Sequence, residues 1–397
     1  MTHRILFFIL LTISLLITSC ENAPVLPDDY YDCSFNLPDP SANHPKNDQF
    51  QAIMDEMIDQ GITGATMYIR TPEGAWSGVG GKADIVKDVN VEKCHKFFIA
   101  SISKVFTATV IFALIEEGKL SLNDQVQDIL TLPVLDKLAN AKEARIRHLL
   151  NHTSGIPDHY TAAFDLENLN RDFNNLSQIE KLEAATPLSA TNEIGETYYY
   201  SNCNYIILGF IAEAVSGQSL AELYDQYIFD PAGLESAYYG TDVRIPPSAT
   251  VRGYLDPYDN GNLVDGEFLY KDELDTPDGG IAIHATDLGR FFEALGQGQL
   301  LQQTAMDSMQ NWFDIPSAWQ WGDSTLSHTG NGYGLEYFST VGGKAIGHTG
   351  GIAGFSSTAL YFPATGHTFV IVINVTTDSL SGFKSAGTRK ALKLMFE

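Results

Sequence analysis

The sequence predicts an α+β fold in which one antiparallel sheet is built from both ends of the chain, is flanked by helices, and has an all-helical lobe inserted. Three observations lead to this prediction. Strand-like stretches lie near residues 65–79 and again near 344–374, residues 120–300 read mostly as helix and loop, and helical segments precede the first strands and follow the last. No linker separates the halves, so we expect residues 47–397 to form a single unit with its active site between sheet and lobe.

The first elements follow from periodicity. Phe50, Ile53, Met54 and Met57 recur at helical spacing and predict a helix over residues 48–60. Strands are expected over residues 65–70 and 76–79, joined by a turn whose Pro72 and Gly74 favour reversal of the chain. The sheet therefore begins near the N-terminus.

The later elements complete the pattern. A long apolar helix is expected from Ser101 to about residue 117, closed by Gly118. Strands are predicted over residues 344–348, 357–362 and 367–374, and a final helix over residues 387–396. Strands at the two chain ends thus bracket the helical middle.

Composition limits the functional classes. The 397 residues are 44% hydrophobic and 18% charged, as in ordinary globular proteins, and the formal net charge is −25. Such a surface repels nucleic acids and anionic lipid head groups. We therefore expect no nucleic-acid partner.

The N-terminus predicts export. Residues 5–17 form an apolar run that is too short for a membrane span of roughly 20 residues but has the length of a signal-peptide core. It ends in Thr18, Ser19 and Cys20, which resembles a bacterial lipoprotein cleavage box. We predict a signal peptide over residues 1–19, lipidation of Cys20, a tether over residues 20–46, and a membrane-anchored lipoprotein on the periplasmic or cell-surface side. The alternative is an ordinary signal peptide with an incidental cysteine.

Three further cysteines, Cys33, Cys94 and Cys203, match no zinc or redox spacing. Export permits a disulfide, for which Cys33 and Cys94 are the better pair. Three free buried thiols are the alternative, and the sequence leaves both open.

Ser101 and Lys104 are the first chemical signal. Residues three apart on a helix share a face. A buried lysine can lose its proton and then accept the proton of a serine, which makes the hydroxyl a nucleophile. A position at a helix N-terminus also favours a developing oxyanion. The alternative is a capping serine beside a solvated lysine.

Two more signals follow along the chain. Tyr200 can relay a proton when a nearby cation lowers its pKa, and Asn202 offers both a donor and an acceptor to a substrate amide. His348 and Thr349 can bind an anion at the end of a strand, where Gly350 and Gly351 allow a substrate backbone to approach. Each signal alone also fits a plain loop or turn.

Together the three signals resemble the S-x-x-K, Y-x-N and K/H-T-G motifs of the serine β-lactamase and penicillin-binding protein superfamily. The Y-x-N form resembles class C β-lactamases and their relatives, the D-alanyl-D-alanine carboxypeptidases and β-lactamase-fold esterases. Residues 146–156, 279–288, 333–335 and 354–355 resemble other stretches of these proteins. The likeness covers roughly residues 48–397.

The resemblance implies a hydrolase that works through an acyl-enzyme. Ser101 attacks a carbonyl, Lys104 and Tyr200 handle its proton, Asn202 holds the substrate amide, and backbone N–H groups of Ser101 and Gly351 form the oxyanion hole. No metal or organic cofactor is expected. The substrate is a peptidoglycan peptide, a β-lactam or an ester.

His348 departs from the lysine usual in β-lactamases. The H-T-G form occurs among the D-alanyl-D-alanine carboxypeptidases of this group, so a carboxypeptidase-like activity is favoured over a β-lactamase or an esterase. A catalytically silent peptidoglycan-binding protein is the rival class. His148 and His152 do not indicate zinc, because Leu149 stands where a zinc protease has glutamate; they are interpreted as structural.

Overall fold

The computed structural model describes residues 29–33, 43–161, 176–239, 248–256, 258, 260–266, 275–377 and 386–397. The chain from Tyr31 onward forms one compact unit. The predicted signal peptide over residues 1–19, the lipidation site Cys20 and most of the tether lie outside the described residues.

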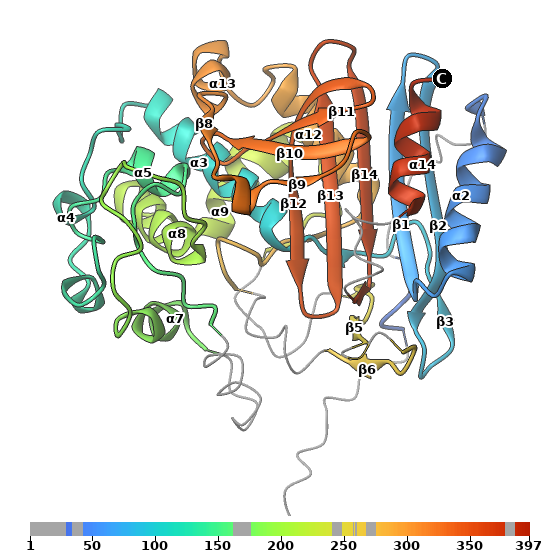
Figure 1. Ribbon diagram of the computed structural model, residues 1–397, viewed down its shortest axis with the longest axis horizontal. Helices are drawn as coiled ribbons and strands as arrows, with labels where there is room; N and C mark the ends of the chain where they lie inside the picture. Colours follow the sequence, from blue (N-terminus) through green and yellow to red (C-terminus); the bar gives the residue numbers. More distant parts are fainter. Residues whose placement is uncertain are drawn as a thin grey trace, which may run out of the picture. The chain divides into compact units, whose positions relative to one another are not determined.

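The central sheet has the strand order β3-β2-β1-β14-β13-β12-β11-β10-β8, with β9 paired to β10, and all of its pairs are antiparallel. β1 lies between β2 and the C-terminal strand β14, so the sheet is built from both chain ends, as predicted (Figure 1). The strands, in chain order, are β1 Gly64–Thr71, β2 Gly74–Asp84, β3 Val89–Asn90, β8 Phe313–Asp314, β9 Trp321–Gly322, β10 Leu326–Asn331, β11 Glu336–Thr340, β12 Gly343–Ile352, β13 Phe355–Phe362 and β14 His367–Ile373.

Helices cover both faces of this sheet. The helices α2 (Asn47–Asp59) and α14 (Ala386–Met395) share a core with the side chains of Met67 and Ile69 on β1. Tyr68 points to the opposite face, where its ring lies against Gly289 of α12 (Ala285–Gly296). Alternate side chains of β1 thus pack into hydrophobic layers on opposite faces of the sheet, which explains why β1 is buried along almost its whole length.

The helical lobe lies beside β12 (Figure 1). Its central helix α3 is buried on nearly all sides, so it carries no polar stripe. The other helices after α2 are α4 Val126–Ile129, α5 Ile146–Leu150, α7 Gln178–Ala185, α8 Asn202–Ser216, α9 Leu220–Tyr224, α10 Asp230–Ala232 and α13 Gln303–Met309, and α3 itself spans Ser103–Glu116. Within the described ranges no single helix is long and apolar enough to cross a membrane. One bent pair of helices, Asn202–Ser216 with Leu220–Ala232, has sufficient length and apolar composition when the two are taken together.

Short elements complete the chain. They are the 3₁₀-helices η2 Ala100–Ile102, η3 Pro133–Asp136 and η6 Ser317–Trp319, the π-helix η4 Asp225–Phe229, and the strands β4 Phe97–Phe98, β5 Tyr254–Leu255, β6 Val264–Asp265, β7 Ala282–Ile283 and β15 Val375–Thr376. β4 pairs with β7 directly before η2, which ties the start of the serine-bearing segment to the segment before α12.

The structure extends the sequence prediction in two places. The strands β8 to β11 were not predicted, because they are short or rich in Gly, Ser and Thr, and the register of β10 shifts between His328 and Gly330. β12 runs on through Gly350 and Gly351 instead of ending near His348. The third motif therefore lies within a strand.

A disulfide joins Cys33 to Cys94, with 5.8 Å between the Cα atoms. Of the two alternatives that the sequence left open, the structure has the bonded one. Cys203 is a free, buried thiol.

Candidate active site

Ser101 sits in the short 3₁₀ turn η2, two residues before α3 begins at Ser103. The residue before it, Ala100, has φ = +50°, a left-handed conformation that a residue with a Cβ adopts only under constraint. The neighbours Ala100 and Ile102 are buried, whereas Ser101 is partly exposed. The fold therefore presents the serine hydroxyl at the end of the helix, close to where the sequence placed it.

Gly350 explains how β12 reaches this turn. A Cβ atom at position 350 would lie 2.3 Å from the carbonyl oxygen of Ile99, so only glycine allows the strand to pack against η2. The Ser357 hydroxyl on β13 donates to the same carbonyl at 2.8 Å. Gly351 is exposed, and a Cβ there would meet nothing within 4 Å. One glycine thus brings the strand to Ser101 and the next faces open space.

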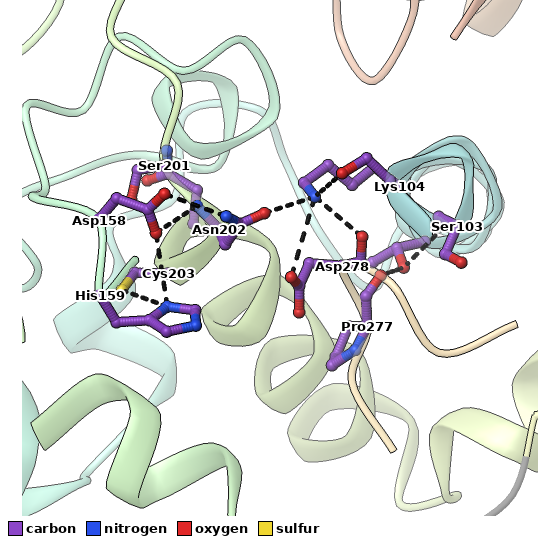
Figure 2. A network of polar contacts seen from close by, with 12 residues as sticks. Ser103, Lys104, Asp158, His159, Ser201, Asn202, Cys203, Pro277 and Asp278 are labelled. Atoms are coloured by element: carbon purple, nitrogen blue, oxygen red, sulfur yellow. Dashed lines mark hydrogen bonds and ion pairs between the residues drawn. The ribbon is translucent and has the colours of Figure 1, made fainter. Parts of the chain in front are cut away.

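Lys104 is the centre of the polar network in Figure 2. Its side chain is fully buried, and its Nζ donates to Ser101 Oγ at 3.1 Å, to Asn202 Oδ1 at 2.7 Å and to the Asp278 carbonyl at 2.8 Å. The Asp278 carboxylate lies 3.9 Å away. These partners compensate a buried cation, and the Ser101 contact is the path by which an amine at this position takes up the serine proton.

Tyr200 also contacts Ser101. Its phenol hydrogen-bonds the Ser101 side chain, and its ring centroid is 5.0 Å from Lys104 Nζ. The ring stacks on that of His152 at a centroid distance of 4.3 Å. Burial raises the pKa of Tyr200 well above its usual 10, although the Ser101 hydrogen bond lowers it. The effect of burial on this pKa therefore exceeds any lowering by nearby groups, and the resting phenol is neutral.

The loop after α5 caps the N-terminus of α8, where helix N–H groups lack partners. His152 Nδ1 accepts from the Ser201 N–H at 3.2 Å, and Asp158 Oδ1 accepts from the Asn202 N–H at 3.1 Å. Burial lowers the pKa of His152 well below 6.5 and raises the pKa of Asp158 to about 7. His152 thus supports the segment at Tyr200 and Ser201, and Asp158 supports Asn202.

The strand residues have partners of their own. Glu336 Oε2 accepts from the Thr349 N–H at 2.8 Å and from the Thr349 hydroxyl at 3.0 Å. β11 begins at Glu336, which pairs with Gly347, so β11 has no backbone carbonyl opposite the Thr349 N–H and the Glu336 side chain accepts from it instead. His348 is buried and its Nδ1 contacts the Thr349 carbonyl. Burial lowers the pKa of His348, against the opposing effect of Glu336, so the neutral ring is favoured at pH 7.

Two groups in the described ranges have the side chains to hold a metal ion. The first comprises His95 with Cys33 and Cys94, but its two sulfurs form the disulfide. The second comprises Asp158, His159 and Cys203. Both carboxylate oxygens of Asp158 already accept hydrogen bonds from Asn202, at 3.1 and 3.0 Å. The contacts present are those of a hydrogen-bonded cluster.

The structure joins four predicted residues, Ser101, Lys104, Tyr200 and Asn202, in one contact network. A positive charge on Lys104 also contributes to the lowered pKa of His348. Sequence reasoning missed four residues that support this network: His152, Asp158, Asp278 and Glu336. His152 had been interpreted as structural, and its stacking on Tyr200 places it against the site. Asp158 stands just after the stretch 146–156, which is the only signal the sequence offers for it.

The chain is also similar to known proteins in sequence and fold. The model of the beta-lactamase family matches residues 49–391. Penicillin-binding protein 4* of Bacillus subtilis (strain 168) is 29% identical over 319 residues, which are 75% of this chain and 65% of that protein. The match therefore covers less than two thirds of that relative's length.

Solved structures share the fold. A D-stereospecific amidohydrolase from Streptomyces sp. superposes with a TM-score of 0.74 at 24% identity, covering 87% of this chain and 97% of that one. A D-amino acid amidase from Ochrobactrum anthropi SV3 gives a TM-score of 0.73 at 23% identity, covering 88% and 97%. With the family match over most of its length, the chain belongs to the beta-lactamase family, within the superfamily of serine β-lactamases and penicillin-binding proteins.

Proposed function

We propose that this protein is a serine hydrolase that cleaves an amide or ester carbonyl through an acyl-enzyme, with a D-alanyl-D-alanine carboxypeptidase-like specificity. The observation that carries the proposal is the buried Lys104 amine at 3.1 Å from the partly exposed Ser101 hydroxyl. A buried amine beside a serine is the arrangement that general-base activation requires. The phenol of Tyr200 on the same hydroxyl supplies a second proton carrier.

The proton path follows these contacts. Lys104 acts in its neutral form, after its own proton has left to solvent. Ser101 Oγ attacks the carbonyl carbon, and the serine proton passes to the Lys104 amine. Tyr200, a neutral phenol at rest, receives a proton from Lys104 as it gives its own to the leaving nitrogen or oxygen. Collapse of the tetrahedral intermediate leaves the acyl group on Ser101. Water then attacks the ester through the same groups and releases the acid and the free serine.

The decisive experiment is covalent labelling. Wild type should give an intact-mass adduct with a fluorescent penicillin or a fluorophosphonate, and Ser101→Ala should give none. A parallel panel of nitrocefin, a D-alanyl-D-alanine peptide and p-nitrophenyl acetate ranks β-lactamase, carboxypeptidase and esterase turnover. Absence of adduct and turnover in folded wild type would instead support a silent peptidoglycan-binding protein.

One observation favours a second candidate, hydrolysis of amides that lack a carboxylate. A carboxypeptidase must bind its substrate's C-terminal carboxylate, but the neutral form of His348 is favoured and the Thr349 hydroxyl donates to Glu336. The similar fold of a D-amino acid amidase is in keeping with this candidate. A D-alanyl-D-alanine peptide and its C-terminal amide form a matched pair. A higher kcat/KM for the amide form selects the amidase, and a higher value for the free acid selects the carboxypeptidase.

We also propose that the protein is exported and anchored through Cys20, as a lipoprotein on the periplasmic or cell-surface side of a bacterial membrane. The support is the sequence of residues 5–20.

A further inference from the structure

Asp158 binds Asn202 through two separate groups. Its Oδ1 accepts from the Asn202 backbone N–H at 3.1 Å, and its Oδ2 accepts from the side-chain Nδ2 at 3.0 Å. The Asp158 side chain is only 13% exposed. The N-cap residue of α8, Ser201, makes no side-chain cap of its own, so a carboxylate from a distant loop takes that place. A carboxylate held in this way fixes both the start of the helix and one side chain on it.

The Asn202 amide lies between the Lys104 amine and the Asp158 carboxyl group, which is ionised above about pH 7. Figure 2 shows its oxygen toward the Lys104 amine and its nitrogen toward the Asp158 carboxylate, with an Nζ–Oδ1 distance of 2.7 Å. Above about pH 7, where Asp158 is ionised, a flipped amide would put its N–H bonds against the N–H bonds of Lys104 and its oxygen against the carboxylate, so both contacts would become repulsive. Hydrogen bonds to charged groups are about twice as strong as neutral ones. The two ends therefore select one amide orientation.

This orientation determines what Asn202 offers to a substrate. Its oxygen is taken by Lys104 and one N–H by Asp158. Because a primary amide has two N–H bonds, the second N–H is the donor that remains for a substrate carbonyl. Without Asp158, only the Lys104 contact would restrain the amide, and the direction of this donor would no longer be fixed.

We propose that Asp158 is a positioning residue for the reaction: it holds the Asn202 amide so that its second N–H binds the acyl-side amide carbonyl of the substrate. This inference rests on the proposed function, because it concerns substrate binding in the same site. If the second Asn202 N–H binds this carbonyl, the substrate must carry an amide on the acyl side of the scissile bond. Peptides meet that demand, and simple esters such as p-nitrophenyl acetate do not.

The kinetic test compares four proteins: wild type, Asp158→Asn, Asn202→Ala and the double variant. Asparagine at position 158 accepts only one of the two donors, because its own NH₂ must face the other. For a blocked D-alanyl-D-alanine peptide we expect kcat/KM to fall by about 10-fold or more in each single variant, since misplaced contacts cost up to 10²-fold. The double variant should lose no more than Asn202→Ala alone. For p-nitrophenyl acetate the change caused by Asp158→Asn should stay below about 3-fold.

Asp84→Asn is the matched control. Asp84 is also buried and accepts from two backbone N–H groups, of Val86 and Lys87, but it lies on β2, four strands away from β12. It should lower stability without separating the two substrates. Equal losses on peptide and ester in Asp158→Asn, multiplicative losses in the double variant, or wild-type peptide turnover in Asp158→Asn would each overturn the inference.

A second readout does not depend on activity. In ¹⁵N-labelled protein the side-chain NH₂ signals of Asn202, identified by their loss in Asn202→Ala, should shift and exchange faster with solvent in Asp158→Ala than in wild type. Unchanged signals would overturn the positioning role. If wild type hydrolyses none of the substrates, the proposed function fails, and the NMR comparison still decides whether Asp158 holds the amide.

Discussion

Replacing Asp158 by asparagine should remove a pH dependence from the stability of the fold. Burial raises the pKa of Asp158 from 3.8 to about 7, and the nearby Asp278 adds to the increase, while Lys104 and the Asn202 N–H oppose it. The folded protein therefore keeps this proton up to about pH 7, whereas the unfolded chain releases it near pH 4. Over that interval the unfolded state binds fewer protons, so the stability contributed by this group falls as pH rises.

The magnitude follows from the shift. A change from 3.8 to about 7 is roughly three pKa units, and each unit corresponds to about 1.4 kcal/mol, which gives roughly 4 kcal/mol between pH 4 and pH 7. Other buried groups, such as His152 and His348, have lowered pKa values and produce the opposite slope, because they lose stability as pH falls below 6.5. The quantity to compare is therefore the difference between wild type and variant at each pH.

Urea unfolding of wild type and Asp158→Asn at intervals from pH 4 to pH 8 measures this difference. Asparagine does not titrate, so relative to wild type the variant should become more stable by up to about 4 kcal/mol as pH rises through the interval and level off above pH 7. A constant offset between the two curves would refute the reasoning, because it would mean that Asp158 has the same pKa in the folded and unfolded chain. Asp84→Asn serves as the control for the loss of a buried carboxylate.

Four further predictions concern the site and the N-terminus. Ser101→Ala should abolish acylation. Ser103→Ala should remain labelled by a fluorescent penicillin, because the Ser103 hydroxyl instead accepts from the Ile281 N–H at 3.1 Å. Tyr200→Phe should slow acylation by at least ~10²-fold in stopped-flow kinetics, and an unchanged rate would reassign the proton relay. Lysine at position 348 in His348→Lys should raise kcat/KM for a D-alanyl-D-alanine free acid relative to its amide at pH 8, where the histidine is neutral; an unchanged ratio would exclude a carboxylate contact at this position. Cys20→Ala should move the protein from the membrane to the soluble fraction after cell lysis, and a variant that still pellets would point to another anchor.

The overall architecture could be predicted from the sequence because helices and strands produce local or periodic patterns of apolar residues. The helical spacing of Phe50, Met54 and Met57 predicted α2. Apolar stretches predicted β1, β13 and β14, and their predicted ends differ from the observed ends by no more than two residues. β10 and β11 were not predicted because many of their residues are small or polar and give no apolar pattern. Their extended conformation is stabilised by pairing with neighbouring strands in the sheet.

The same distinction holds at the site. Ser101 and Lys104 are three residues apart, so a helical turn alone brings them together, and the sequence determined this pair. Asp158 and Asn202 are 44 residues apart, and Lys104 and the Asp278 carbonyl are 174 apart. No local pattern encodes such contacts, because they depend on how loops pack against helix ends.

The sequence by itself determined the fold class, the family and the contact between Ser101 and Lys104, since these depend on residue type and short-range spacing. Tertiary structure decided the protonation states and the orientation of the side chains. Burial raises the pKa of Tyr200 and lowers that of His348, in each case favouring the neutral form. The cost of removing a charge from water depends on every atom packed around it, and that surrounding exists only in the folded chain.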